Sequence, residues 1–180
     1  MIDYVSLMLV NMAAGLVIVA LYILQPICSD ENKGWSVAFI MSGLIAAITG
    51  FTMTFTWPLP SPYNTAFGEM SVLLGIILIG AGISIAKGWS LLPVCVYAIF
   101  AGLAAMLVGW RFIDLGLSQK PLLSGIGFIL PGIGGVCAWM VVHFKKQLWL
   151  RIAGAAVLFA AAGIWLFTGC MAYWFHLLVK

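Results

Sequence analysis

A small set of polar side chains stands within otherwise apolar stretches of the chain, and these are the residues whose types could do chemistry. Glu69 follows a proline-rich segment, and Arg111 and Asp114 are spaced so that both lie on one face of a helix. The other members of the set are Asn11, Thr52, Thr56 and His176. Charged, amide and hydroxyl groups can bind and orient a small polar solute through hydrogen bonds. Because polar groups in hydrocarbon are costly, the set predicts a binding site or vestibule.

A structural explanation of the same residues stays open. Glu69 could complement the positive end of a helix, and Arg111 and Asp114 could form an interfacial ion pair. The hydroxyls of Thr52 and Thr56 could donate to carbonyls of their own helix. Pro131, which lies among several glycines, predicts a kink or a short unwound stretch that could shape a solute path or serve packing alone.

Other kinds of chemistry lack their residues. The two histidines fall at opposite faces, and the four cysteines include no Cys-x-x-Cys pair. We therefore expect no metal site and no cofactor, because such sites in helix bundles need several convergent ligands. No nucleophile with a matching base and acid is recognisable, so we expect no enzymatic activity.

The composition decides the class of protein. Of the 180 residues, 64% are apolar and 7% are charged, with 8 basic and 5 acidic residues for a formal net charge of +3. A soluble domain carries roughly 25% charged residues, so this chain has too few to cover a surface in water. Eight scattered basic residues do not form a basic face, which argues against nucleic acid as a partner. An integral membrane protein remains, with the lipid bilayer as its surroundings.

Six apolar runs are long enough to cross a membrane, since about 20 residues span the hydrocarbon layer. We predict helices at residues 4–27, 35–57, 67–86, 89–110, 121–144 and 148–179. The runs are too long and continuous for the short alternating strands of a barrel. The loops between them are short, so the sequence predicts an all-α bundle of six transmembrane helices in one domain, residues 1–180.

The loop charges predict how the bundle is oriented. Six spans place both termini on one side, which carries Arg111, Lys120 and Lys180. The opposite side carries Lys33, Lys87, Lys145, Lys146 and Arg151. Because loops rich in Lys and Arg stay in the cytoplasm, we expect a multi-pass protein of the cell membrane with its termini outside. On this topology the polar set lies in the outer half, as a vestibule requires.

Small residues predict close helix packing. The chain has 20 glycines, and small residues recur at intervals of four, as in Ala101, Ala105 and Gly109, and in Ala156 and Ala160. Such spacing lets helix backbones approach each other in a membrane. The same faces would suit a homo-oligomer.

Three segments carry a resemblance to a known family. They are MIDYVSLMLVN at 1–11, FTWPLPSPYNTAFGEM at 55–70 and WRFIDLG at 110–116. Together they resemble a bacterial and archaeal membrane family known as a domain of unknown function, which implies no activity. In architecture only, the chain is also similar to the urea-channel and amide-transporter family, with an apolar helix, a Trp-containing turn and a helix like that from Trp89 to Ala105. No functional residue is transferred from that family.

The leading hypothesis is a passive channel or facilitator for a small, mostly uncharged polar solute. The uncharged centres of the spans favour it, because such pores reject ions by apolar constrictions. Two alternatives remain: an accessory subunit of a larger membrane complex, for example a respiratory one, and a protein that binds a quinone or lipid.

Overall fold

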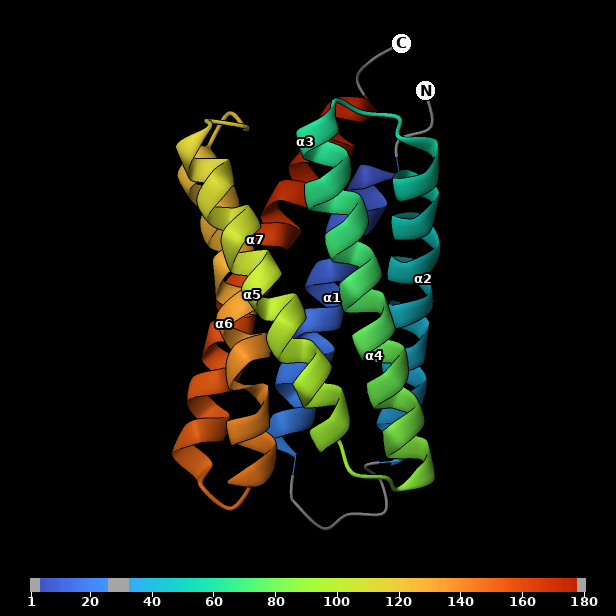
Figure 1. The fold of residues 1–180 in the computed structure, drawn as a ribbon, viewed down its shortest axis with the longest axis vertical. Helices are drawn as coiled ribbons and strands as arrows, with labels where there is room; N and C mark the ends of the chain where they lie inside the picture. The colour runs from blue at the N-terminus through green and yellow to red at the C-terminus, as the bar shows by residue number, and fades with distance from the viewer. Residues whose placement is uncertain (1–3, 26–32, 178–180) are drawn as a thin grey trace.

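The long helices stand side by side in one bundle (Figure 1). This computed structural model describes residues 4–25 and 33–177. The elements in chain order are α1 (Val5–Leu24), α2 (Trp35–Thr56), α3 (Ser61–Tyr63), the π-helical η2 (Asn64–Glu69), α4 (Met70–Lys87), α5 (Leu92–Asp114), α6 (Pro121–His143) and α7 (Leu148–His176). With α3, η2 and α4 counted as one span, six helices in the described residues are long and apolar enough to cross a membrane. The predicted all-α, six-span fold is confirmed.

The bundle has two distinct ends. α1 begins and α7 finishes at the same end, which also holds α3 and the connection from α5 to α6 (Figure 1). We call this the termini end, and it confirms that the first span begins and the last span finishes on one side. The opposite end, which we call the basic end, carries Lys33, Lys87, Lys145, Lys146 and Arg151.

Two predicted helix boundaries change because of local turn chemistry. The third span begins at Ser61, six residues before the predicted start, because Pro62 lies in the first turn, where its missing N–H needs no partner. The Leu59 N–H donates to Oδ1 of buried Asn64 at 3.1 Å, which closes the turn before the helix. α5 starts at Leu92, where the Ser90 hydroxyl accepts a hydrogen bond from the Leu92 N–H, and it continues through Arg111 and Asp114.

Glycines bring two pairs of helices into backbone contact. α2 packs against α4, and α5 packs against α6. A Cβ built on Gly75 would lie 2.6 Å from the Ala47 backbone nitrogen, and one on Gly109 would lie 2.6 Å from the Gly125 carbonyl oxygen. Any larger residue at these points would push the helices apart. The structure thus uses glycine packing where the sequence predicted it in general, although Ala156 and Ala160 of α7 are exposed in this chain.

Large side chains fill the bundle at the termini end. The rings of Phe67, Phe112, Phe128 and Trp165 contact one another, with centroids 4.8 Å apart for Phe128 and Trp165 and 5.3 Å apart for Phe112 and Phe128. These edge-to-face and tilted pairs lie within the usual range for aromatic contacts. From the rim, the Tyr63 hydroxyl donates to the Leu117 carbonyl oxygen at 2.6 Å. The four rings and Tyr63 are called the aromatic cluster below.

Candidate functional site

The predicted polar set does not gather around either of the two cavities described below. Arg111 and Asp114 form a salt bridge within α5, and their side chains are 53% and 50% exposed. Spacing therefore predicted the pair correctly, but the pair lies on the surface of the bundle. Such a half-exposed local ion pair adds little to stability, and its position suits the interfacial pair that the sequence left open.

The other outer residues are spread over several elements. The hydroxyls of Thr52 and Thr56 are exposed on α2 and donate to the carbonyls of Ile48 and Thr52 at 2.8 and 2.7 Å. Glu69 is half-buried in the last position of η2, and within the described residues it forms no salt bridge. His176 is exposed in the last turn of α7. The threonines are therefore engaged with their own helix.

Asn11 joins two helices. Its side chain is buried, and Nδ2 donates to the Ser42 carbonyl oxygen at 2.9 Å, while the Ser42 hydroxyl donates to the Asn11 carbonyl oxygen at 3.4 Å. The pair connects α1 to α2 inside the bundle. Asn11 thus satisfies its hydrogen bonding by packing, as buried polar groups in a membrane must.

Pro131 leaves α6 helical, because the structure has no unwound stretch between Pro121 and His143. Proline removes the hydrogen bond to the carbonyl four residues earlier, which belongs to Gly127. That carbonyl oxygen accepts a hydrogen bond from Nε1 of buried Trp165 at 2.7 Å. The freed acceptor thus has a tertiary partner on α7. Of the two predicted outcomes the short unwound stretch is not present, and the kink at Pro131 stays a prediction.

A cavity of about 520 Å³ opens at the basic end. Its wall includes Tyr22 of α1, Ser84 of α4, Leu92 at the start of α5 and Val142 of α6. The size falls within the roughly 300–1,000 Å³ typical of small-molecule sites. The cavity lies where α5 and α6 stand apart from α1 and α4, and we call it the basic cavity.

Positive charge surrounds the basic cavity. Lys33, Lys145 and Arg151 line it, and among the residues that the structure describes no Asp or Glu does. The wall is therefore electropositive. His143 also belongs to the lining, but its ring packs on that of Phe144 with 4.8 Å between centroids.

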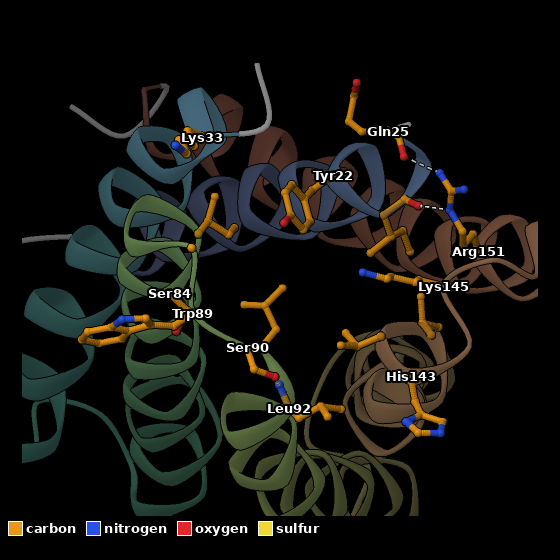
Figure 2. Close-up of a pocket in the computed structure, with 16 residues that line it drawn as sticks. Tyr22, Gln25, Lys33, Ser84, Trp89, Ser90, Leu92, His143, Lys145 and Arg151 are labelled. Carbon is orange, nitrogen blue, oxygen red and sulfur yellow. Dashed lines mark hydrogen bonds between the residues drawn. The ribbon is translucent and has the colours of Figure 1, made fainter. Parts of the chain in front are cut away.

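Figure 2 shows how these side chains differ in direction. The ammonium of Lys145 and the hydroxyl of Tyr22 point into the cavity, whereas the His143 ring points away from it. Lys33 lies on the opposite side of the opening from Lys145. The two lysines are therefore placed to contact one occupant from two sides.

Arg151 has a different task from the lysines. It is 9% exposed, and its Nε donates to the Ile23 carbonyl oxygen at 2.6 Å while Nη2 donates to that of Gln25. These are carbonyls at the end of α1, where no further turn of helix can donate to them. Arg151 thus holds the end of α1 against the start of α7.

A second, apolar cavity of about 140 Å³ adjoins the first deeper in the bundle. The two share Tyr22, Ile23, Leu91, Val141 and Val142 in their walls. Small residues, Ala81 of α4 and Ala98 of α5, leave the space that larger side chains would fill. We call it the apolar cavity. Together the two form a pocket with a charged mouth and an apolar depth.

Sequence reasoning missed this pocket because it treated the basic residues as loop charges that set orientation. The available signal was their concentration at one end, next to the polar turn Lys87–Ser90. Within the described residues no three His, Cys, Asp or Glu side chains come close enough to hold a metal ion.

Comparison with known proteins adds a family and no activity. A family model described as a protein of unknown function, DUF981, matches residues 1–178. No curated protein and no solved structure matches the chain. The predicted resemblance to a family of unknown function is confirmed, while the resemblance to urea channels has no support here and stays a prediction.

Proposed function

Because the chain belongs to the DUF981 family, whose description states no function, we propose a function from the site itself: this integral membrane protein binds a lipid-like amphiphile at its basic end. The observation that carries the proposal is the joined pair of cavities, one lined by cations and the other apolar. An amphiphile has the same two parts in the same order. A quinone or lipid ligand was one alternative that the sequence left open, and this pocket favours it.

The position of the pocket along the bundle supports a ligand taken from the membrane. The basic cavity lies at the ends of the helices, at the level of the Lys33 and Lys145 side chains, and the apolar cavity lies among the spans themselves. A molecule with its head at the interface and its tail in hydrocarbon is already oriented for such a site. Entry then needs no transfer through water.

The orientation of the protein belongs to the same proposal. In the described residues the basic end carries five Lys and Arg residues, and the termini end carries two, Arg111 and Lys120. The basic end therefore faces the cytoplasm by the positive-inside tendency. The ligand then comes from the cytoplasmic leaflet of the cell membrane.

Blocking the apolar cavity tests the proposal. The full chain is purified in a mild detergent with added lipid, and bound lipid is counted by native mass spectrometry. Ala98→Trp fills the apolar cavity, whereas Ala156→Trp places the same ring on the exposed face of α7. We expect stoichiometric lipid on the unmodified protein and on A156W, and loss of it from A98W. Absence of bound lipid from the unmodified protein, or equal occupancy in both variants, would overturn the proposal.

A passive facilitator for a small, mostly uncharged polar solute is a second proposal. The observation that favours it is that the central sections of the spans carry no charged side chain, as a pore that rejects ions requires. Under it, the outer residues Glu69, Arg111 and Asp114 meet the solute first. Liposome swelling with a panel of neutral solutes tests it, since permeation no faster than through bare lipid would count against it.

An accessory subunit of a larger membrane complex is a third proposal, of another class. The tiny loops and the long exposed apolar helix faces support it. Gentle extraction followed by native mass measurement distinguishes the cases: a stoichiometric unrelated partner favours the subunit, and a homo-oligomer favours the facilitator.

A further inference from the structure

The charge of the mouth identifies the class of amphiphile. Resting on the proposed amphiphile site, we infer that its occupant is an anionic phospholipid whose phosphate lies between Lys33 and Lys145. The inference assigns a chemical class of ligand and two recognising residues to the basic cavity. A few methylene groups of one acyl chain occupy the apolar cavity, whose volume is about 140 Å³.

Positive charge lining the cavity is the first observation. Lys33, Lys145 and Arg151 line it, and within residues 4–25 and 33–177 no carboxylate lines it. The one salt bridge among the described residues, between Arg111 and Asp114, lies at the termini end. Lys33 and Lys145 are exposed at the mouth, where an anionic head group supplies a counter-charge and a ligand without net charge does not.

The second observation is that the three cationic side chains have different hydrogen-bonding partners. Arg151 donates to the carbonyls of Ile23 and Gln25, so it builds the wall. The Lys145 ammonium points into the cavity and has no hydrogen-bond partner among the described side chains, and Lys33 lies on the other side of the opening (Figure 2). The first turn of α5 adds the positive end of a 23-residue helix at the same mouth.

Chemistry favours a phosphate over a carboxylate. A phosphate offers acceptor oxygens in several directions, and lysine binds phosphate as a point charge. Basic pockets between transmembrane helices at the cytoplasmic side are known to hold anionic lipid head groups. A single-cation site would have suited a fatty acid equally well.

The experiment compares an anionic with a zwitterionic phospholipid, which both carry the phosphate but differ in net head-group charge. The purified full chain is titrated with phosphatidylglycerol and with phosphatidylcholine of identical acyl chains, and occupancy is measured by native mass spectrometry. Lys145→Gln and Lys33→Gln remove one charge each from the mouth. Lys87→Gln and Lys146→Gln are matched controls, because these lysines are exposed at the same end but do not line the cavity.

We expect the unmodified protein to prefer phosphatidylglycerol about 25-fold, and each mouth variant to prefer it only about fivefold, because one lysine near an anionic head contributes a factor of about five. The controls keep the preference. Inorganic phosphate and glycerol phosphate, added in excess, should not displace the lipid, because they lack the chain.

Three results would overturn the inference. The first is that the unmodified protein, K145Q and K33Q all bind the two lipids equally, while A98W still abolishes lipid binding. The proposed amphiphile site then stands, but it does not select for charge. Another is equal loss of preference in the controls, which points to surface charge. A third is displacement by inorganic phosphate alone, which identifies a site for a free anion. If A98W instead binds as much lipid as the unmodified protein, the proposed function itself is wrong.

Discussion

The two ends of the bundle are built on opposite principles. At the termini end the aromatic cluster fills the space between helices from α1 to α7, and Trp165 and Phe112 are each 1% exposed. At the basic end the helices surround two cavities, although a second cluster of buried side chains, including Phe39, Leu78 and Ile85, packs α2 against α4 beside them. The spans are apolar along their whole length, so hydropathy does not distinguish the two ends. The difference is whether the facing side chains fill the space between the helices.

The contrast also shows where rigid packing ends and an adaptable site begins. The glycine contacts of α2 with α4 and of α5 with α6 hold each pair together. α4 and α5 make few contacts with each other, and the apolar cavity lies beside them. Packing at the termini end thus fixes the arrangement of the helix pairs, and the cavities at the basic end leave room for a ligand.

Removing the largest ring from the termini end should have the largest effect on the free energy of unfolding. We expect Trp165→Ala to lower the free energy of unfolding by about 3–5 kcal/mol, because the change leaves a cavity and an unpaired Gly127 carbonyl. Thermal unfolding in detergent measures it. Trp174→Ala is the control on the same helix, since that ring is 66% exposed, and equal losses in the two variants would contradict a packed termini end.

At the basic end, we expect Arg151 to contribute most to stability. Arg151→Gln removes the hydrogen bonds to Ile23 and Gln25 and should lower the free energy of unfolding by about 1.5–3 kcal/mol, as expected for bonds from a charged donor. Lys146→Gln removes a nearby exposed charge and should leave the melting temperature unchanged. If Arg151→Gln behaves like K146Q, the end of α1 does not depend on this side chain.

One substitution placed in the filled core and beside the apolar cavity tests the difference in packing directly. Ala161→Leu adds volume where the side chain is fully buried, and overpacking should lower the free energy of unfolding by about 1–3 kcal/mol. Ala81→Leu points the same added volume at the apolar cavity and should change stability little. The pair of melting curves is the measurement, and comparable losses would show that the apolar cavity is not open space.

The smallest expected effect is a coupling between α6 and α7. Trp165→Phe leaves the Gly127 carbonyl unpaired, and Pro131→Ala restores the backbone donor that this carbonyl lacks. In the P131A background we expect the loss from W165F to shrink by about 1 kcal/mol, the net value of one buried hydrogen bond. A double-mutant cycle of unfolding free energies measures the coupling. Strict additivity would mean that Trp165 does not compensate for the proline.

The local chemistry of the candidate residues was largely predictable from spacing. Arg111 and Asp114 pair as their separation of three suggests, and the hydroxyls of Thr52 and Thr56 donate to their own helix, one of the two possibilities that the sequence left open. Whether such residues share one cavity depends on how helices rotate against each other. The rotation of one helix against another cannot be inferred from a single segment that is apolar on all sides.

The sites that matter most depend on partners far away in the chain. From the sequence, Pro131 implies that the Gly127 carbonyl loses its helical hydrogen bond. The donor that replaces it, Trp165, lies 38 residues from Gly127. Arg151 looks like a loop charge until its side chain is found on Ile23, 128 residues earlier. Neither contact follows from local pattern, because each needs the relative positions of two helices.

By itself, the amino-acid order determined that this chain spans a membrane six times, with its termini together and its basic residues gathered opposite them. Those properties follow from local hydropathy and from counts of charge, which need no knowledge of neighbours. Only the tertiary structure decided which end is filled and which is hollow. That outcome depends on which large or small side chains face one another across the helices, and an almost uniformly apolar sequence does not record it.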